Sequence, residues 1–245
     1  MAILRTEGII CSQLHHGEHG VIARIFTPNH GLMSGYVRGG RSRTMRPILI
    51  SSNKVRAEFR SRNEDQLGGL NVELVESRGQ WLGEPLASAA LEWVCALMAS
   101  SLPQDNSYPQ LYSAMDALLL AICGAPSARG WVQALVQFEL LSLSQLGFGL
   151  DLDKCAVSGE MNNLSYVSPK SGRAVSDAAA IGHERKLLTL PNFILSNDDK
   201  PSWDDIFAGL QLTGYFLERN FFTDRRNNIF SARNILTDRL KRVVA

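Results

Sequence analysis

The stretch EGIICSQLHHGEHGVIARIFTPNHGLMSGYVRGG, residues 7–40, decides the fold of this chain. It contains three short apolar or β-branched runs, EGIICSQL, VIARIF and LMSGYVRG, and turn-forming residues separate each run from the next. Short runs of this kind, bounded by Gly, Pro, Asn and similar residues, are typical of β-strands. We therefore predict three consecutive strands joined by turns at residues 15–20 and 28–31.

Two more strands are predicted from the residues that follow. In KVRAEFRSR, residues 54–62, polar and apolar side chains alternate strictly, so that Val55, Ala57 and Phe59 face one way. The stretch LGGLNVELVES, residues 67–77, supplies a fifth strand. Five short strands with glycine-rich turns indicate a small closed barrel, and the five-stranded oligonucleotide-binding (OB) barrel is the expected architecture.

After residue 80 the pattern changes from strands to helices. Long segments rich in Ala and Leu, bounded by Pro or Gly, predict helices over 85–102, 108–122 and 128–147, then a helix capped by Ser202 with Asp205 and a basic helix over 231–244. A turn-rich insertion at 151–180 interrupts them. The expected fold is therefore α+β, with an OB domain over 1–80 and a mostly helical domain over 81–245.

The net charge of +1 hides a strongly uneven distribution of charge. Residues 36–62 hold eight basic side chains and one acidic one, and residues 81–218 hold seven basic and fifteen acidic ones. From residue 219 to the end there are seven basic side chains and two acidic ones. Such an asymmetry indicates a polyanionic partner for the basic segment.

The third strand and the loop after it give this partner a predicted site. Tyr36 and Arg38 lie two residues apart and share one strand face. Gly39 and Gly40 let the backbone approach a ligand closely, and the arginines reach for phosphates. The predicted nucleic-acid contacts are Tyr36, Arg38, Gly39, Gly40, Arg41, Arg43, Arg46, Lys54, Arg56, Arg60 and Arg62. The alternative is a solvated strand face that binds nothing.

Metal and catalytic sites are not expected. Cys11, His15, His16 and His19 could ligate zinc, but they lack a second ligand pair at finger-like spacing, and exposed turn histidines are the simpler interpretation. The acids Asp198, Asp199, Asp204 and Asp205 flank a helix start, where they favour the helix dipole rather than a magnesium site. No pairing of a nucleophile with a base is evident, so no catalytic residues are predicted. Neither a metal nor a cofactor is expected.

The chain carries no membrane or export signal that we recognise. No apolar run is long enough to span a bilayer, and Arg5 and Glu7 interrupt the amino-terminal stretch where a signal peptide needs apolar residues. The four cysteines are far apart in the sequence, and Cys95 and Cys123 lie in apolar helical segments. We expect reduced thiols and a cytoplasmic, nucleoid-associated protein.

Several stretches in the same order resemble one family. The matching segments are residues 7–43, QFELLSLSQLGFGLDLDKCAVSGE (137–160) and YVSPKSGRAV (166–175), with weaker agreement from GYFLERNFF (214–222) to ARNIL (232–236). On these segments the chain resembles the bacterial DNA-repair and recombination mediator RecO. The resemblance spans nearly the whole chain.

This resemblance implies an amino-terminal OB barrel, a helical carboxy-terminal domain and no enzymatic activity. Family members bind single- and double-stranded DNA, anneal complementary strands and contact the carboxy-terminal tail of the single-strand-binding protein. Together with RecR they load the recombinase RecA onto DNA, so that RecA is an indirect partner. The basic glycine-containing loop of the family corresponds here to Gly39, Gly40, Arg41 and Arg43, with Arg38 just before it.

The chain departs from the family in the insertion at 151–180. Many relatives carry four zinc-binding cysteines there, beginning with a Cys-x-x-Cys pair. Here the pair is Cys155-Ala-Val-Ser158, and no cysteine follows it. A hydroxyl is a poor zinc ligand, so we expect a degenerate zinc finger that holds no metal and depends on packing and turn hydrogen bonds.

Two other functions remain open at this point. An OB protein with the same charges could bind RNA, which a comparison of matched DNA and RNA strands would reveal. A metal-dependent nucleic-acid enzyme using His15, His16 and His19 is the third possibility, and a stoichiometric metal would favour it.

Overall fold

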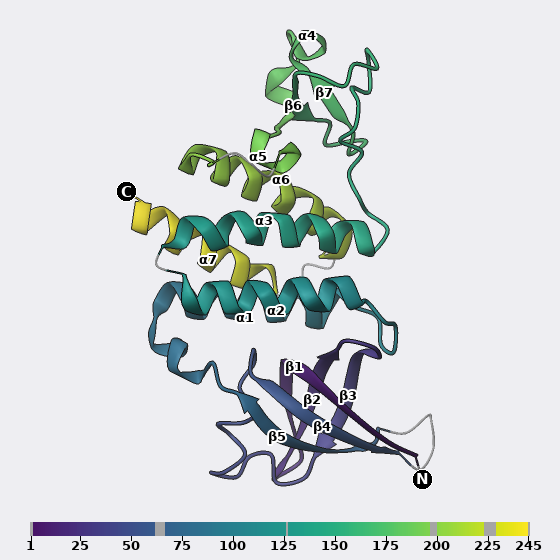
Figure 1. Cartoon of the computed structure of the whole chain (residues 1–245), viewed down its shortest axis with the longest axis vertical. Coiled ribbons are helices and arrows are strands. Elements are labelled where there is room, and N and C mark those ends of the chain that lie inside the picture. The colour runs from purple at the N-terminus through teal and green to yellow at the C-terminus, as the bar shows by residue number, and fades with distance from the viewer. Residues whose placement is uncertain (1, 62–66, 126, 197–199, 223–228, 245) are drawn as a thin grey trace. The chain divides into compact units, whose positions relative to one another are not determined.

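The computed structural model describes residues 2–61, 67–125, 127–196, 200–222 and 229–244. The chain forms two compact units, one made of Met1–Gly124 with Asn228–Ala245 and the other of Ala125–Asn227 (Figure 1). The domain boundary predicted after residue 80 lies where strands give way to helices. The two compact units, in contrast, divide the chain after Gly124.

The first unit contains the predicted five-stranded barrel. Its strands are β1 (Ala2–His16), β2 (Gly20–Thr27), β3 (Gly31–Val37), β4 (Lys54–Ser61) and β5 (Gly69–Glu76). They close in the order β1-β2-β3-β5-β4, with β3 and β5 parallel at Tyr36 and Gly69 and the other neighbours antiparallel. This closed barrel followed by helices confirms the predicted fold class.

Strand alternation decides which side chains fill the barrel. Val55, Ala57 and Phe59 of β4 are buried, while their neighbours Arg56 and Arg60 are exposed. Inward residues of the other strands join them in one core: Ile10, Val21, Ala23, Ile25, Val37, Leu70 and Val72. Phe59 is thus a core residue, as the alternation of polar and apolar residues in this strand predicted.

The segment between β3 and β4 is anchored to the barrel core. Consecutive turns run through it, with hydrogen bonds from Ser42 N to Gly39 O (2.9 Å) and from Leu49 N to Met45 O (3.0 Å). Leu49 is fully buried in the barrel core, and Met45 and Ile48 pack against it. The basic loop is therefore held at its carboxy-terminal side by apolar packing.

Helices complete the first unit. These are the 3₁₀ turn η1 (Gly79–Gly83), α1 (Pro85–Ser101), α2 (Pro109–Gly124) and α7 (Phe230–Val244). The helix α1 contacts β1, β2, α2 and α7, so it lies between the barrel and the other helices of this unit. Burial of its Ala, Leu, Trp and Cys side chains explains why this segment is nearly free of charge.

A buried arginine joins the barrel to α2. The Arg78 side chain is 1% exposed and donates from Nη1 to the carbonyl of Ser52 (2.6 Å). Its Nη2 lies 3.2 Å from Glu76 Oε2 and 3.3 Å from Asp116 Oδ1 in α2. Asp116 also pairs with Lys54 of β4 at 2.7 Å. Barrel and α2 therefore share one ion-pair network.

The second unit combines helices with a small sheet. Its helices are α3 (Ala128–Gln145), α4 (Asp177–Ala180), η2 (Glu184–Lys186), α5 (Asn192–Leu195) and α6 (Trp203–Phe221). The strands β6 (Leu164–Val167), β7 (Ala174–Ser176) and β8 (Leu188–Thr189) form a sheet in the order β7-β6-β8. Helix α6 packs on α3 and begins with the predicted capping pair, because Ser202 and Asp205 bond reciprocally.

The thiol of Cys155 organises the turn that precedes this sheet. Its Sγ accepts hydrogen bonds from the amides of Val157 (3.5 Å), Ser158 (3.4 Å) and Ser176 (3.3 Å), and from Ser176 Oγ (3.4 Å). Burial raises the pKa of the Cys155 thiol, but the hydrogen bonds from Ser158 and Ser176 outweigh it and lower this pKa to about 6. The described residues contain no group of three or more potential metal-ligating side chains.

These hydrogen bonds predict an unusual thiol titration. Cys155 should ionise near pH 6, whereas burial raises the pKa of Cys11 to about 12 and the pKa values of Cys95 and Cys123 above the ordinary range. We expect a step in ultraviolet thiolate absorbance near pH 6 that Cys155→Ser abolishes. Because the folded pKa lies below the unfolded one of about 8.5, the thiolate stabilises the fold above about pH 8.5, and this stabilisation is lost as the pH falls through 6.

The stability effect can be measured by urea unfolding of the parent and of Cys155→Ser, below pH 6 and above pH 8.5. The difference in free energy of unfolding of the second unit between the parent and the variant should be larger above pH 8.5. An equal difference at both ends, or an unchanged absorbance step in the variant, would contradict this assignment.

Candidate nucleic-acid interface

Four arginines of the basic loop are open to solvent. Arg38, Arg41, Arg43 and Arg46 are all exposed, and within the described parts of the chain none of them forms an ion pair with a carboxylate. Arg41 alone is tied to the barrel, since its amide and its Nη1 donate to the carbonyls of His19 (3.3 Å) and Glu18 (2.9 Å). We call these four residues the arginine loop. Their charges remain available to an external anion.

Glycine is needed at the two glycine positions of this loop for different structural reasons. Gly39 has a φ of +66°, a left-handed conformation that residues with a side chain rarely adopt. Gly40 is buried, and a Cβ there would lie 2.8 Å from Cβ of Val21. The absence of a side chain at Gly40 thus allows close packing on β2, which keeps the arginine loop against that strand. A close approach of a ligand to the backbone at these glycines stays a prediction.

Tyr36 lies beside the arginine loop on the outer face of the barrel. Its half-buried ring covers Gly20, where a Cβ would lie 2.3 Å from the Tyr36 hydroxyl oxygen. The ring also meets His16 edge to face, with ring centroids 5.9 Å apart. Tyr36 thus bridges β3 to the end of β1 across β2.

The cations of β4 are in a different environment. Glu58 lies between Arg5 and Arg60, with Nε atoms of both arginines 2.6 Å from its carboxylate oxygens. Hydrogen bonds from Arg5 and Arg60 hold the pKa of Glu58 below its usual range. Arg56 lies 3.9 Å from Glu7 and 3.4 Å from Glu73. Lys54 pairs with Asp116 as described above.

The outer face of β1, β4 and β5 is therefore an alternating network of charges. A shallow depression on this face is lined by residues of both signs, including Arg5, Arg56, Glu58 and Glu73. The β4 cations were predicted nucleic-acid contacts, but three of their carboxylate partners, Glu7, Glu73 and Asp116, belong to other elements and are not evident from the β4 segment. The role of the β4 cations in binding remains a prediction, as does that of Arg62, which lies outside the described residues.

The histidine cluster does not form a metal site among the described residues. The Cys11 thiol is buried and lies 3.6 Å from the carbonyl oxygen of Ile9. His15, His16 and His19 are exposed on the end of β1 and the turn after it. Of the acidic residues considered for magnesium, Asp205 caps α6, and Asp198 and Asp199 lie outside the described residues.

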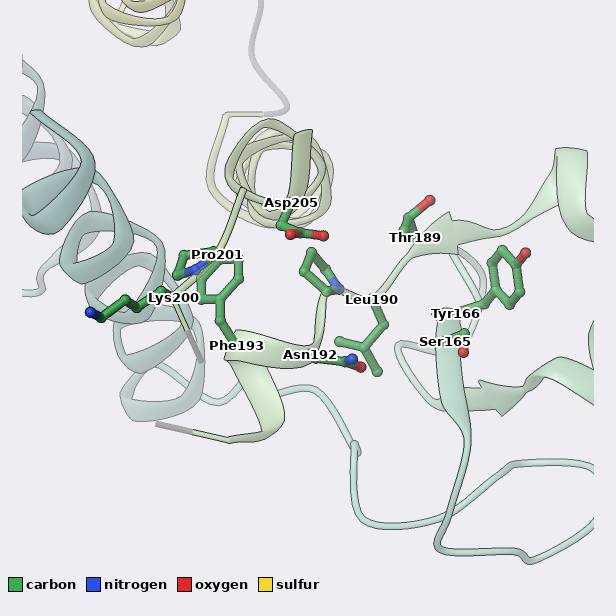
Figure 2. A pocket seen from close by; sticks show the side chains of 10 residues that line it. Ser165, Tyr166, Thr189, Leu190, Asn192, Phe193, Lys200, Pro201 and Asp205 are labelled. Carbon is green, nitrogen blue, oxygen red and sulfur yellow. The ribbon is translucent and has the colours of Figure 1, made fainter. Parts of the chain in front are cut away.

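A pocket in the second unit is another place where catalytic groups could gather. It has a volume of about 410 Å³ and lies between β6, β8, α5 and the start of α6. Figure 2 shows that the Lys200 amino group points away from Tyr166 and Thr189, whose side chains lie on the opposite side of the view. The carboxylate of Asp205 is occupied by Ser202, with contacts of 2.9 Å and 2.6 Å. These polar groups do not converge on a reacting atom.

Comparisons with known proteins agree over most of the chain. The family model described as Recombination protein O N terminal matches residues 1–78, and the one described as Recombination protein O C terminal matches residues 82–227. The chain belongs to the RecO family. Together the two RecO models cover the barrel, α1 to α6 and the small sheet, so the arginine loop lies inside the amino-terminal match.

Individual RecO proteins match at similar levels. The chain is 39% identical over 235 residues to the DNA repair protein RecO of Caulobacter sp. strain K31, covering 96% of each chain. It is 40% identical over 239 residues to that of Rhodospirillum rubrum, covering 96% of this chain and 95% of the relative. Jannaschia sp. strain CCS1 has a RecO protein that is 38% identical over 242 residues, covering 98% and 97%. The predicted family resemblance is confirmed.

Within the described residues, no helix is both long and apolar enough to cross a bilayer.

Proposed function

We propose that this chain is a DNA-binding mediator of DNA repair that acts without catalysis. The observation that carries the proposal is the arginine loop: four exposed guanidinium groups without carboxylate partners among the described residues, on the OB barrel of a RecO family member. Guanidinium groups bind phosphate oxygens in bidentate fashion, and a cluster of them attracts a polyanion without reading its sequence. The names of the relatives, DNA repair protein RecO, support the process.

Strand annealing follows from the same chemistry. Two single strands repel each other, and a surface that neutralises both backbones lowers the cost of bringing them together before base pairing begins. This needs no nucleotide hydrolysis. We further propose, from the family resemblance, that the chain acts with RecR in loading RecA onto DNA covered by single-strand-binding protein.

The tail of the single-strand-binding protein needs a cation next to apolar surface. In the second unit, the guanidinium carbon of Arg129 lies 5.4 Å from the centroid of the Trp203 ring, and that ring lies 6.0 Å from Phe207. Both rings are partly exposed. This pairing of charge and aromatic surface supports contact with a tail that is acidic and ends in an apolar residue.

Salt dependence of single-strand binding tests the proposed function. If the four loop arginines each neutralise one phosphate, log affinity should fall with log salt with a slope of about −2.8. The measurement is fluorescence anisotropy with a labelled single strand at several salt concentrations, alongside an RNA strand of the same sequence. A slope near zero would exclude phosphate binding by this loop, and clearly tighter binding of RNA would favour an RNA partner.

A further inference from the structure

A row of apolar side chains crosses the outer face of the first three strands. Leu14 of β1 is the register partner of Ile22 of β2, and Ile22 is the register partner of Tyr36 of β3. Their inward neighbours Val21, Ala23 and Val37 belong to the barrel core, so these three side chains must point outward. We call Leu14, Ile22 and Tyr36 the apolar row.

The next position along the same face extends this row toward the arginine loop. His16 is the register partner of Gly20, and Gly20 carries no side chain that could separate His16 from Tyr36. The Tyr36 ring fills the space over Gly20 and contacts the edge of His16. Arg38 follows Tyr36 by two residues, so a strand continued past Val37 would place it on this same face.

The apolar row lies near the ends of its strands and is partly open to solvent. Leu14 is 66% exposed, and Ile22 and Tyr36 are half-buried. The next pair along the same face is Arg24 of β2 and Ser34 of β3, and other elements contact it. Arg24 Nη1 donates to the carbonyl of Ala99 at the end of α1, and Gln104 Nε2 donates to Ser34 Oγ (3.0 Å). On the other side of the barrel, β4 presents its ion pairs. The apolar row therefore lies between helix-covered surface and the arginine loop.

We propose that the apolar row is where unpaired bases of a single DNA strand stack while the arginine loop holds the phosphates of that strand. This rests on the proposed function. Neighbouring cations select a polyanionic occupant, and among polyanions a single nucleic-acid strand also presents apolar ring faces at the spacing of its phosphates. Bases stack on aromatic and apolar side chains without regard to sequence. In duplex DNA the base faces are stacked inside, so the apolar row gives preference for single strands.

Tyr36→Leu is the informative variant. Leucine keeps apolar cover over Gly20 but removes the ring, so folding should be preserved. We expect about a tenfold loss of affinity for a single strand, with duplex affinity within about twofold and an unchanged salt slope. Leu14→Ala should act in the same direction. The matched control is Leu74→Ala, since Leu74 is another exposed leucine of the barrel, 42% exposed, on β5.

A second variant moves the ring rather than removing it. In Gly20→Ala the added methyl group would overlap the hydroxyl end of Tyr36, 2.3 Å away, and the flexible ring must swing out. Gly20 is not in a left-handed conformation, so alanine is tolerated by the backbone. We expect single-strand affinity to fall as in Tyr36→Leu.

An abasic strand separates stacking from phosphate binding. Such a strand keeps its phosphates and lacks bases, so parent and Tyr36→Leu should bind it equally and weakly, whereas loss of the loop arginines should weaken it further. If Tyr36→Leu equals the parent on the normal strand while arginine variants bind poorly, the stacking proposal is wrong and the proposed function stands. If arginine variants also bind normally, the proposed function itself fails.

Discussion

A variant with Arg38, Arg41 and Arg43 changed to alanine should bind single-stranded DNA about a hundredfold more weakly at 0.1 M salt. Each lost phosphate contact removes about 0.7 from the salt slope, which corresponds to roughly fivefold in affinity at this salt concentration, and three contacts multiply. All three side chains are exposed, so the substitutions should leave the fold intact. Annealing of complementary strands should slow in parallel.

The matched control uses cations of the same strand system that are already paired. Arg56 and Arg60 lie in carboxylate contacts with Glu7, Glu58 and Glu73. Changing both to alanine removes two positive charges but leaves their carboxylates, so we expect at most a few-fold loss. Equal losses in the control and in the loop variant would mean that binding follows net charge alone and that the arginine loop is not the site.

The contrast between these two sets of arginines shows what the sequence could predict. Short apolar runs between turn residues identified the strands, and alternation in residues 54–62 identified the buried row of β4 and the outward direction of Arg56 and Arg60, because both are local properties of the sequence. Whether an outward arginine is free depends on what lies beside it. Glu58 is two residues from Arg60, but Arg5 comes from β1 and Glu73 from β5. A charge count along one segment cannot include partners that only barrel closure brings together.

The same reasoning explains the apolar row. Alternation in β1 places Ser12, Leu14 and His16 on one face, but a bulge between Ile10 and Ser12 shifts the register. The sequence carries no sign of that bulge. Only the register of β1, β2 and β3 aligns Leu14 with Ile22 and Tyr36. The loop glycines were recognisable from sequence, yet the packing of Gly40 on Val21 required the fold.

The family resemblance reached further than local patterns did, because it covers segments far apart in the chain. It identified the barrel followed by helices, which the structure confirms. It could not show that α1, α2 and α7 form one compact unit with the barrel. That grouping depends on contacts such as the ion pair between Arg78 and Asp116. Neither residue belongs to a motif that would have indicated this role.

This buried arginine leads to the largest expected change in stability. Arg78→Met should lower the free energy of unfolding of the first unit by about 3 kcal/mol, because it leaves the carbonyl of Ser52 without its buried donor and leaves Asp116 with Lys54 but without its second cation. Arg78→Lys should be nearly as harmful, since one ammonium cannot reproduce contacts that two guanidinium nitrogens make. Hydrogen exchange of β4 and α2 amides, compared with that of α3 and α6, would assign the loss to the first unit.

Arg5→Ala is the control for Arg78, because Arg5 also pairs with a carboxylate but its side chain is 74% exposed. An exposed pair contributes about 1 kcal/mol or less, so this variant should be close to the parent. A fragment ending at residue 80 loses Asp116 together with α1, which covers β1 and β2. It should therefore unfold more readily than the whole chain. Should Arg78→Met and Arg5→Ala prove equally mild, and the fragment as stable as the intact protein, the ion-pair network would not be what joins the barrel to α2.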